Sequence, residues 1–183
     1  MAATSSKMVP LGTPAPDFSL PDVVSGETVR LADLPADRPL LVTFLSRHCP
    51  YVWHVKAALA QLGRDYRGRA SLVAISANDA RAYPEDAPER LRALAVETGF
   101  NFPVCYDEPQ TTARAYGATC TPDFFLYNSQ RRLVYRGQLD VSRPGNGVPV
   151  TGTDVRAALE ALLAGQPVAA SQSPSLGCNI KWK

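Results

Sequence analysis

The sequence predicts an α/β protein with a mixed central β-sheet and helices on both faces. Apolar runs of strand length alternate with amphipathic helical segments along the chain. The first two such runs are separated by a helix, and right-handed crossovers make strands joined in this way parallel. Two later runs are separated only by a short polar turn, which predicts an antiparallel pair.

The first half of the chain contains a hairpin and a strand–helix–strand unit. Residues 1–16 are polar and proline-rich, and we expect a loose lead-in. Residues 17–34 predict a hairpin that turns at Ser-Gly. The apolar runs at 39–46 and 71–77 predict strands covered on both faces, and the intervening segment 51–66 has apolar residues at helical spacing.

The second half continues the alternation. A helix is predicted to begin at Pro88, because proline suits the first helical turn. Residues 102–107 predict a short strand and 108–117 a helix that ends at its glycine. The apolar runs 123–128 and 132–137 are the predicted antiparallel pair.

The C-terminal part is expected to be one helix and a tail. Residues 153–165 form an amphipathic pattern that ends at a glycine, and 166–183 are a Pro/Ser-rich tail with a small apolar end. A length of 183 residues is typical of one domain with additions. We therefore interpret 1–183 as a single domain.

Composition argues against several classes of partner. Hydrophobic residues make up 45% and charged residues 20% of the chain, as in ordinary globular proteins. The net charge is +2 with no block of Lys or Arg, so neither nucleic acid nor a membrane surface is an expected partner. The first residues lack the apolar run of a secretory signal, and we expect a cytoplasmic protein without a bound cofactor.

Four scattered cysteines are too few for a disulfide framework in a chain of this length, so each needs its own interpretation. Cys105 falls in the middle of a predicted strand and is interpreted as a core residue. Cys49 differs, because it lies between the strand 39–46 and the following helix.

The position of Cys49 predicts a reactive thiol. Ligands of α/β sheets bind at the carboxyl ends of the parallel strands, where helix N-termini point. Unpaired N–H groups and the positive end of the helix dipole lower the pKa of a thiol placed there. Arg47 and His48 could add positive charge. The alternative is a buried, inert cysteine.

Two other polar clusters are not interpreted as sites. His48, Cys49 and His54 do not converge on one point, since neighbouring helical residues diverge, so no metal site is predicted. The carboxylates of the loop before Pro88 are expected to form a solvated surface: Asp79, Glu85, Asp86 and Glu89.

Several segments in order carry a family resemblance: RHCPYV, ISANDARAYPEDAPE, FPVCYDE, ATCTPDFFLYN and GCNIKWK. The chain from about residue 14 onward resembles the thioredoxin fold and, more narrowly, the peroxiredoxin-like branch of the alkyl hydroperoxide reductase/thiol-specific antioxidant family. The resemblance implies a thiol-dependent oxidoreductase with Cys49 as the nucleophile.

Ser46 stands where members of this branch usually carry the first cysteine of Cys-x-x-Cys. A serine cannot form a disulfide, so dithiol exchange within the motif is excluded. True peroxiredoxins carry Thr or Ser there, and its hydroxyl hydrogen-bonds the thiolate and the peroxide. The resemblance thus implies a catalytic role for Ser46, with simple helix capping as the alternative.

Two departures weaken the comparison with a full peroxidase site. The peroxiredoxin proline before the Ser/Thr position is missing from LLVTFL. The arginine that polarises the peroxide should fall near Pro122, which matches the cis-proline of thioredoxins instead. Arg47 is a conceivable substitute donor. Because peroxidase chemistry depends on donors aimed at the leaving oxygen, we expect a modest rate enhancement.

The resemblance also assigns roles around Pro122. A cis Thr121–Pro122 bond would bring the Thr121 backbone against Cys49, where it could pair with an extended peptide substrate. Cys120 would lie on the same face and could resolve an oxidised Cys49, with plain packing as the alternative. For Cys178 in the tail, a packed terminus is favoured over a mobile resolving cysteine.

Two classes of function remain. In the first, Cys49 attacks a peroxide to give a sulfenic acid, resolved by Cys120 or an external thiol, or attacks a disulfide to give a mixed disulfide. The expected partner is a thioredoxin- or glutathione-like thiol reductant. The second class is a non-catalytic binding or thiol-sensing protein that has lost the first motif cysteine.

Overall fold

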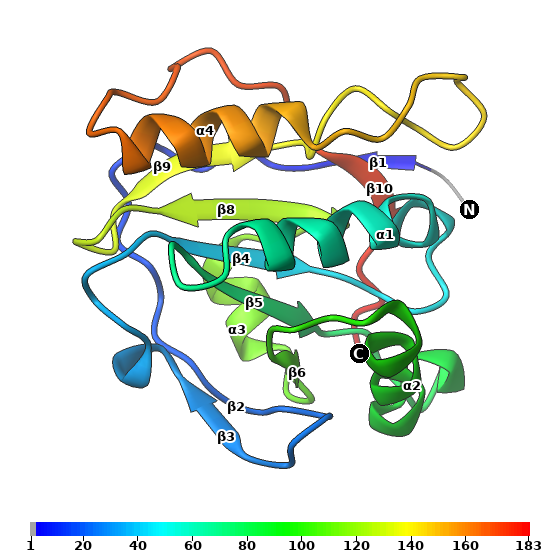
Figure 1. The fold of residues 1–183 in the computed structure, drawn as a ribbon. Coiled ribbons are helices and arrows are strands. Elements are labelled where there is room, and N and C mark those ends of the chain that lie inside the picture. The colour runs from blue at the N-terminus through cyan, green and yellow to red at the C-terminus, as the bar shows by residue number, and fades with distance from the viewer. Residues whose placement is uncertain (1–2) are drawn as a thin grey trace.

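The computed structural model describes residues 3–183 and has a five-stranded central sheet (Figure 1). The strand order is β6-β5-β4-β8-β9. Strands β4, β5 and β6 are parallel, whereas β8 and β9 run antiparallel to their neighbours. The bounds are β4 (Leu40–Phe44), β5 (Ser71–Ser76), β6 (Val104–Tyr106), β8 (Asp123–Tyr127) and β9 (Leu133–Gly137). The predicted mixed sheet is therefore confirmed.

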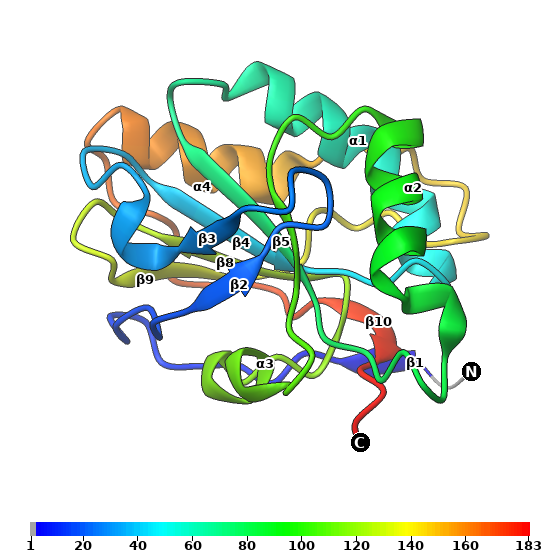
Figure 2. The same cartoon turned by 90° about the horizontal axis from the view of Figure 1, so that it is seen from below.

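Helices cover both faces of this sheet (Figure 2). Helices α1, α2 and α4 lie on one side and α3 lies on the other. The bounds are α1 (Pro50–Asp65), α2 (Pro88–Thr98), α3 (Thr111–Tyr116) and α4 (Thr153–Leu163). Helices α1 and α2 begin with a proline, where the missing N–H has no intrahelical partner to lose.

The side chains of successive β4 residues pack into hydrophobic clusters on opposite faces of the sheet, as expected for a strand covered on both faces. Leu41 packs with residues of α1 and α4, whereas Val42 and Phe44 pack with Phe125 and Tyr116 on the α3 side. The rings of Phe44 and Tyr116 meet edge-on with centroids 5.6 Å apart. A third cluster joins α1 to α2 and includes Cys49.

A second, three-stranded sheet joins the two ends of the chain, in the order β1-β10-β7. Its strands are β1 (Ala3–Ser5), β7 (Cys120–Thr121) and β10 (Leu176–Asn179), all antiparallel. A loose lead-in was expected over 1–16. This was wrong for β1, because β1 forms backbone hydrogen bonds with one edge of β10. Residues 1–2 lie outside the described part of the chain.

The predicted hairpin is β2 (Ser19–Pro21) with β3 (Thr28–Arg30), paired antiparallel. Gly26 in its turn has φ +78°, a conformation that glycine adopts without steric cost. Two short 3₁₀ turns complete the structure, at Leu31–Asp33 and Pro84–Asp86. Within residues 3–183, every helix is too short or too polar to cross a lipid bilayer.

Candidate active site around Cys49

Cys49 is the N-cap residue of α1 and follows the carboxyl end of β4 by a short loop. Pro50 is the first helical residue, and the N–H of Trp53 donates to the Cys49 carbonyl at 3.0 Å. The helix N-terminus therefore lies where the sequence predicted it. However, Cys49 has 0% exposure, so it is buried as the alternative interpretation expected.

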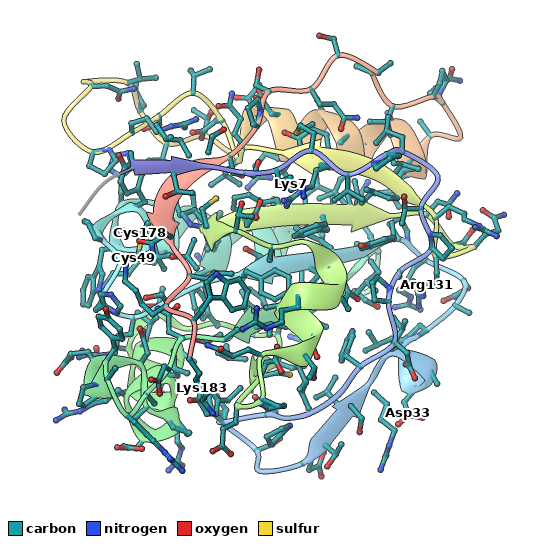
Figure 3. All side chains as sticks on the ribbon, turned by 180° about the vertical axis from the view of Figure 1, so that it is seen from behind. Lys7, Asp33, Cys49, Arg131, Cys178 and Lys183 are labelled. Carbon is teal, nitrogen blue, oxygen red and sulfur yellow. The ribbon has the colours of Figure 1, made fainter. Side chains whose placement is uncertain are left out.

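The Cys49 sulfur touches two groups that are distant in sequence. Its Sγ lies 2.8 Å from Sγ of Cys178, 129 residues further along the chain, and 3.1 Å from the Thr121 carbonyl oxygen. Cys178 lies in β10, and the two cysteines are adjacent in Figure 3. Cys178 is itself only 3% exposed. The packed terminus favoured from the sequence is present, and it places a second thiol beside the first.

Strand β10 occupies the edge of β7. Cys178 pairs antiparallel with Thr121, whose peptide bond to Pro122 is cis. A Cβ added to Gly177 would lie 2.0 Å from the Thr121 carbonyl oxygen, so only glycine permits this close approach. The Thr121 backbone, expected to be open to a peptide substrate, is therefore covered by the chain's own tail.

The surroundings of Cys49 favour its thiolate. The Cys178 thiol and the N–H groups of Val52 and Cys178 favour a negative sulfur. Burial opposes ionisation, but together these donors lower the pKa of Cys49 to about 6. The Cys178 hydrogen bond is the largest contribution, and the negative charge on Cys49 in turn raises the pKa of Cys178.

Ser46 is fully buried, but its hydroxyl does not serve either of the roles expected for it. It donates to the carboxylate of Asp86 at 3.0 Å, which occupies its only proton. Helix α1 has no side-chain cap. Neither the direct contact with the thiolate nor the helix cap is seen, and Ser46 instead holds the loop before Cys49 in place.

Asp86 was missed by the sequence analysis, which expected a solvated carboxylate. It is 0% exposed and accepts hydrogen bonds from the Arg47 N–H at 2.6 Å and from Asn78 Nδ2 at 2.7 Å. His48 Nδ1 lies 2.5 Å from the same carboxylate. The Asn78 side chain also accepts the Lys181 N–H at 2.8 Å. Asp86 thus connects the loop before Cys49 to the C-terminal tail through one intervening side chain.

The side chains of Arg47 and His48 are engaged with other residues instead of the Cys49 sulfur. The Arg47 guanidinium forms an ion pair with Glu85. The His48 ring stacks on Tyr83 with centroids 5.4 Å apart, while His54 contacts Ser142 at 2.7 Å. The positive charge that the sequence suggested for Cys49 is not among the groups that lower its pKa.

Cys120 is buried but does not touch Cys49. Its Sγ makes a weak contact with the Pro122 carbonyl oxygen at 3.8 Å. The contact between β7 and the Cys49 sulfur is made by the carbonyl oxygen of the next residue, Thr121. Burial raises the pKa of Cys120. In the described chain, the sulfur in contact with Cys49 is therefore that of Cys178, in place of the predicted Cys120.

The loop around Pro122 is fixed from behind by a buried ion pair. Asp123, directly after Pro122, lies 2.5 Å from Arg136 Nη1, and both side chains have 0% exposure. Arg136 also donates to the Lys7 carbonyl at 3.0 Å and lies over the Phe125 ring at 3.7 Å. The segment around Pro122, which places Thr121 next to Cys49, is thus anchored through Arg136 to the central sheet and to the N-terminal segment.

A thiol on a helix N-terminus beside a cis-proline, on a mixed sheet, is the arrangement of thioredoxin-fold thiol proteins. The chain matches the AhpC/TSA family over residues 11–136, more than half of its length. The protein belongs to the AhpC/TSA family.

Two solved structures are similar to this chain over nearly its whole length. An uncharacterized conserved protein from Geobacillus kaustophilus is 52% identical, with a TM-score of 0.98, over 100% of this chain and 97% of that one. A hypothetical protein from Sinorhizobium meliloti 1021 is 50% identical over 98% of both chains, with a TM-score of 0.96.

More distantly, a putative thioredoxin from Neisseria meningitidis is 27% identical, with a TM-score of 0.57, over 73% of this chain and 82% of that one. No curated protein matches. Family and structural neighbours together support a thiol-dependent redox function in general.

Proposed function

We propose that this protein is a thiol peroxidase in which the Cys49 thiolate attacks a small peroxide. The observation that carries the proposal is the Cys49 sulfur itself, held at the N-terminus of α1 with a pKa lowered to about 6. At neutral pH such a group is more fully ionised than a free cysteine of pKa about 8.5.

Strand β10 covers Cys49, and this favours a small oxidant over a protein disulfide as the substrate. A protein substrate needs an extended segment beside the cis-proline, and β10 already pairs with Thr121 there. A small peroxide does not need an extended segment beside the cis-proline in order to react with the buried sulfur. In the reaction, the thiolate takes one peroxide oxygen, the O–O bond breaks, and the departing oxygen leaves as an alcohol or water after protonation.

The test is oxidation of the reduced protein by stoichiometric hydrogen peroxide, followed by mass spectrometry of each cysteine. We expect Cys49 to be oxidised first and Cys105, equally buried, to remain a thiol. A Cys49→Ser variant should consume no peroxide, and a Cys105→Ala variant should behave as wild type. If Cys49 survives excess peroxide unchanged, the proposal is wrong.

The second candidate, a thiol sensor without turnover, is favoured by the 0% exposure of Cys49 and by the engagement of Arg47 with Glu85. The two functions differ in recycling. A peroxidase consumes many equivalents of peroxide when a dithiol reductant is supplied, whereas a sensor is oxidised once. Steady-state peroxide consumption with dithiothreitol or a thioredoxin distinguishes them.

A further inference from the structure

The tail strand β10 brings a second thiol to Cys49 in the same way that a bound peptide would. Cys178 is placed by backbone pairing with Thr121, and its sulfur lies 2.8 Å from that of Cys49. Sulfurs in a disulfide are about 2.05 Å apart. The pair therefore needs a small rearrangement, and no unfolding, to form a covalent bond.

We propose that β10 is a self-docked resolving strand, in which Cys178 forms a disulfide with Cys49 inside the folded chain. This inference rests on the proposed function for its first step, the oxidation of Cys49. In the second step, Cys178 Sγ attacks the Cys49 sulfenic acid, the S–O bond breaks, and water leaves with the Cys178 proton. An external dithiol then reduces the disulfide to two thiols and is itself oxidised to a disulfide.

Several contacts hold β10 in position for this step. It is paired on both edges, by β1 and β7. Beyond it, the Lys181 N–H donates to Asn78 and the Lys181 carbonyl accepts from Gln110 Nε2 at 2.8 Å. The side chain of Ile180 is 1% exposed. A strand fixed in this way keeps the Cys178 thiol at the sulfur that it is to attack.

The other cysteines do not compete for this role. Cys120 contacts the carbonyl oxygen of Pro122, just beyond β7, and Cys105 lies in the α3-side core of the sheet. Burial raises the pKa of Cys105 to about 12 and also raises that of Cys120. Ser46, at the usual position of the motif partner, has no sulfur. Cys178 thus supplies the second sulfur that the motif lacks.

The experiment is peptide mapping after oxidation, with thiols blocked under denaturing conditions. Reduced wild-type protein is treated with stoichiometric hydrogen peroxide or, separately, with diamide, a small thiol oxidant. We expect each to give one disulfide within the chain, linking Cys49 to Cys178, with the loss of two hydrogens per molecule. Cys120→Ala and Cys105→Ala variants should form the same bond.

The variants separate this inference from the proposed function. In Cys178→Ala, peroxide should leave a Cys49 sulfenic acid that dimedone captures, whereas wild type should give almost none. In Gly177→Ala, the added Cβ pushes β10 from Thr121, so the disulfide should form more slowly although Cys178 is present.

A Cys49–Cys120 bond, a disulfide between chains, or equal sulfenic acid in wild type and Cys178→Ala would overturn the inference while leaving the peroxidase proposal intact. If peroxide leaves Cys49 unreacted but diamide forms the Cys49–Cys178 bond, the peroxidase proposal fails. The inference that Cys178 forms a disulfide with Cys49 is then retained.

Discussion

Cys49 and Cys105 are both completely buried, yet their surroundings have opposite effects on the sulfur. Cys105 lies within β6, where desolvation and the nearby charge of Asp22 raise its pKa to about 12. Cys49 lies at a helix N-terminus, and donors from the tail and from α1, the Cys178 thiol first among them, lower its pKa to about 6. Burial alone does not make a thiol inert; the decisive factor is which hydrogen-bond donors accompany the sulfur.

The largest expected effect comes from removing the support behind the Cys49 site. Asp123→Ala leaves Arg136 as an unpaired buried charge, which typically costs about 3–5 kcal/mol. We expect this loss in the free energy of unfolding measured by urea denaturation. Asp37→Ala, which removes an exposed ion pair, should have a much smaller effect. Equal effects would show that the Asp123–Arg136 pair is not a support of this site.

The two thiols predict opposite dependences of stability on pH. Because the pKa of Cys49 is depressed in the folded state, its stabilising contribution is absent below pH 6 and grows until pH about 8.5. Cys105 has a raised pKa, so its contribution is lost only above pH about 8.5.

The comparison is measured under reducing conditions as the difference in unfolding free energy between wild type and each variant. The difference for Cys49→Ala should grow from pH 6 to 8, and that for Cys105→Ala should stay constant. A flat difference for Cys49→Ala would remove the contrast between the two cysteines.

The next largest loss of stability is expected from replacing Asp86, the carboxylate that binds the loop before Cys49. Asp86→Asn loses acceptor capacity for the backbone and side-chain donors that converge on it, and we expect a cost of about 2–3 kcal/mol. Glu85→Gln, at the exposed neighbouring residue, is the matched control and should cost under about 1 kcal/mol. Thermal unfolding of both variants measures the difference, and an effect of Glu85→Gln as large as that of Asp86→Asn would contradict it.

The smallest effect is expected at Arg47, the residue that the sequence suggested as a donor to the site. Arg47→Ala removes a partly exposed ion pair, worth at most about 1 kcal/mol. The ultraviolet absorbance of the Cys49 thiolate should titrate as in wild type, because Arg47 does not contact the sulfur. In Cys178→Ala the same titration should move toward pH 8.5. A rise in the Cys49 pKa in Arg47→Ala would restore the original expectation.

The sequence by itself determined the layered α/β architecture, the position of Cys49 at the start of α1, and the place of Cys105 in a core strand. These features follow from apolar periodicity and from Pro50, which act over a few neighbouring residues. Only the tertiary structure decided that Asp86 is buried and that Cys178 lies beside Cys49. Those contacts depend on backbone pairing between a two-residue strand and a tail more than fifty residues away, for which side-chain patterns carry little signal.

The Thr121 segment and the C-terminal tail bring a carbonyl oxygen and a second thiol into contact with the Cys49 sulfur. A single local motif places that sulfur, but segments remote in sequence give it its charge and its partner, since hydrogen bonds act on whatever the fold brings within reach.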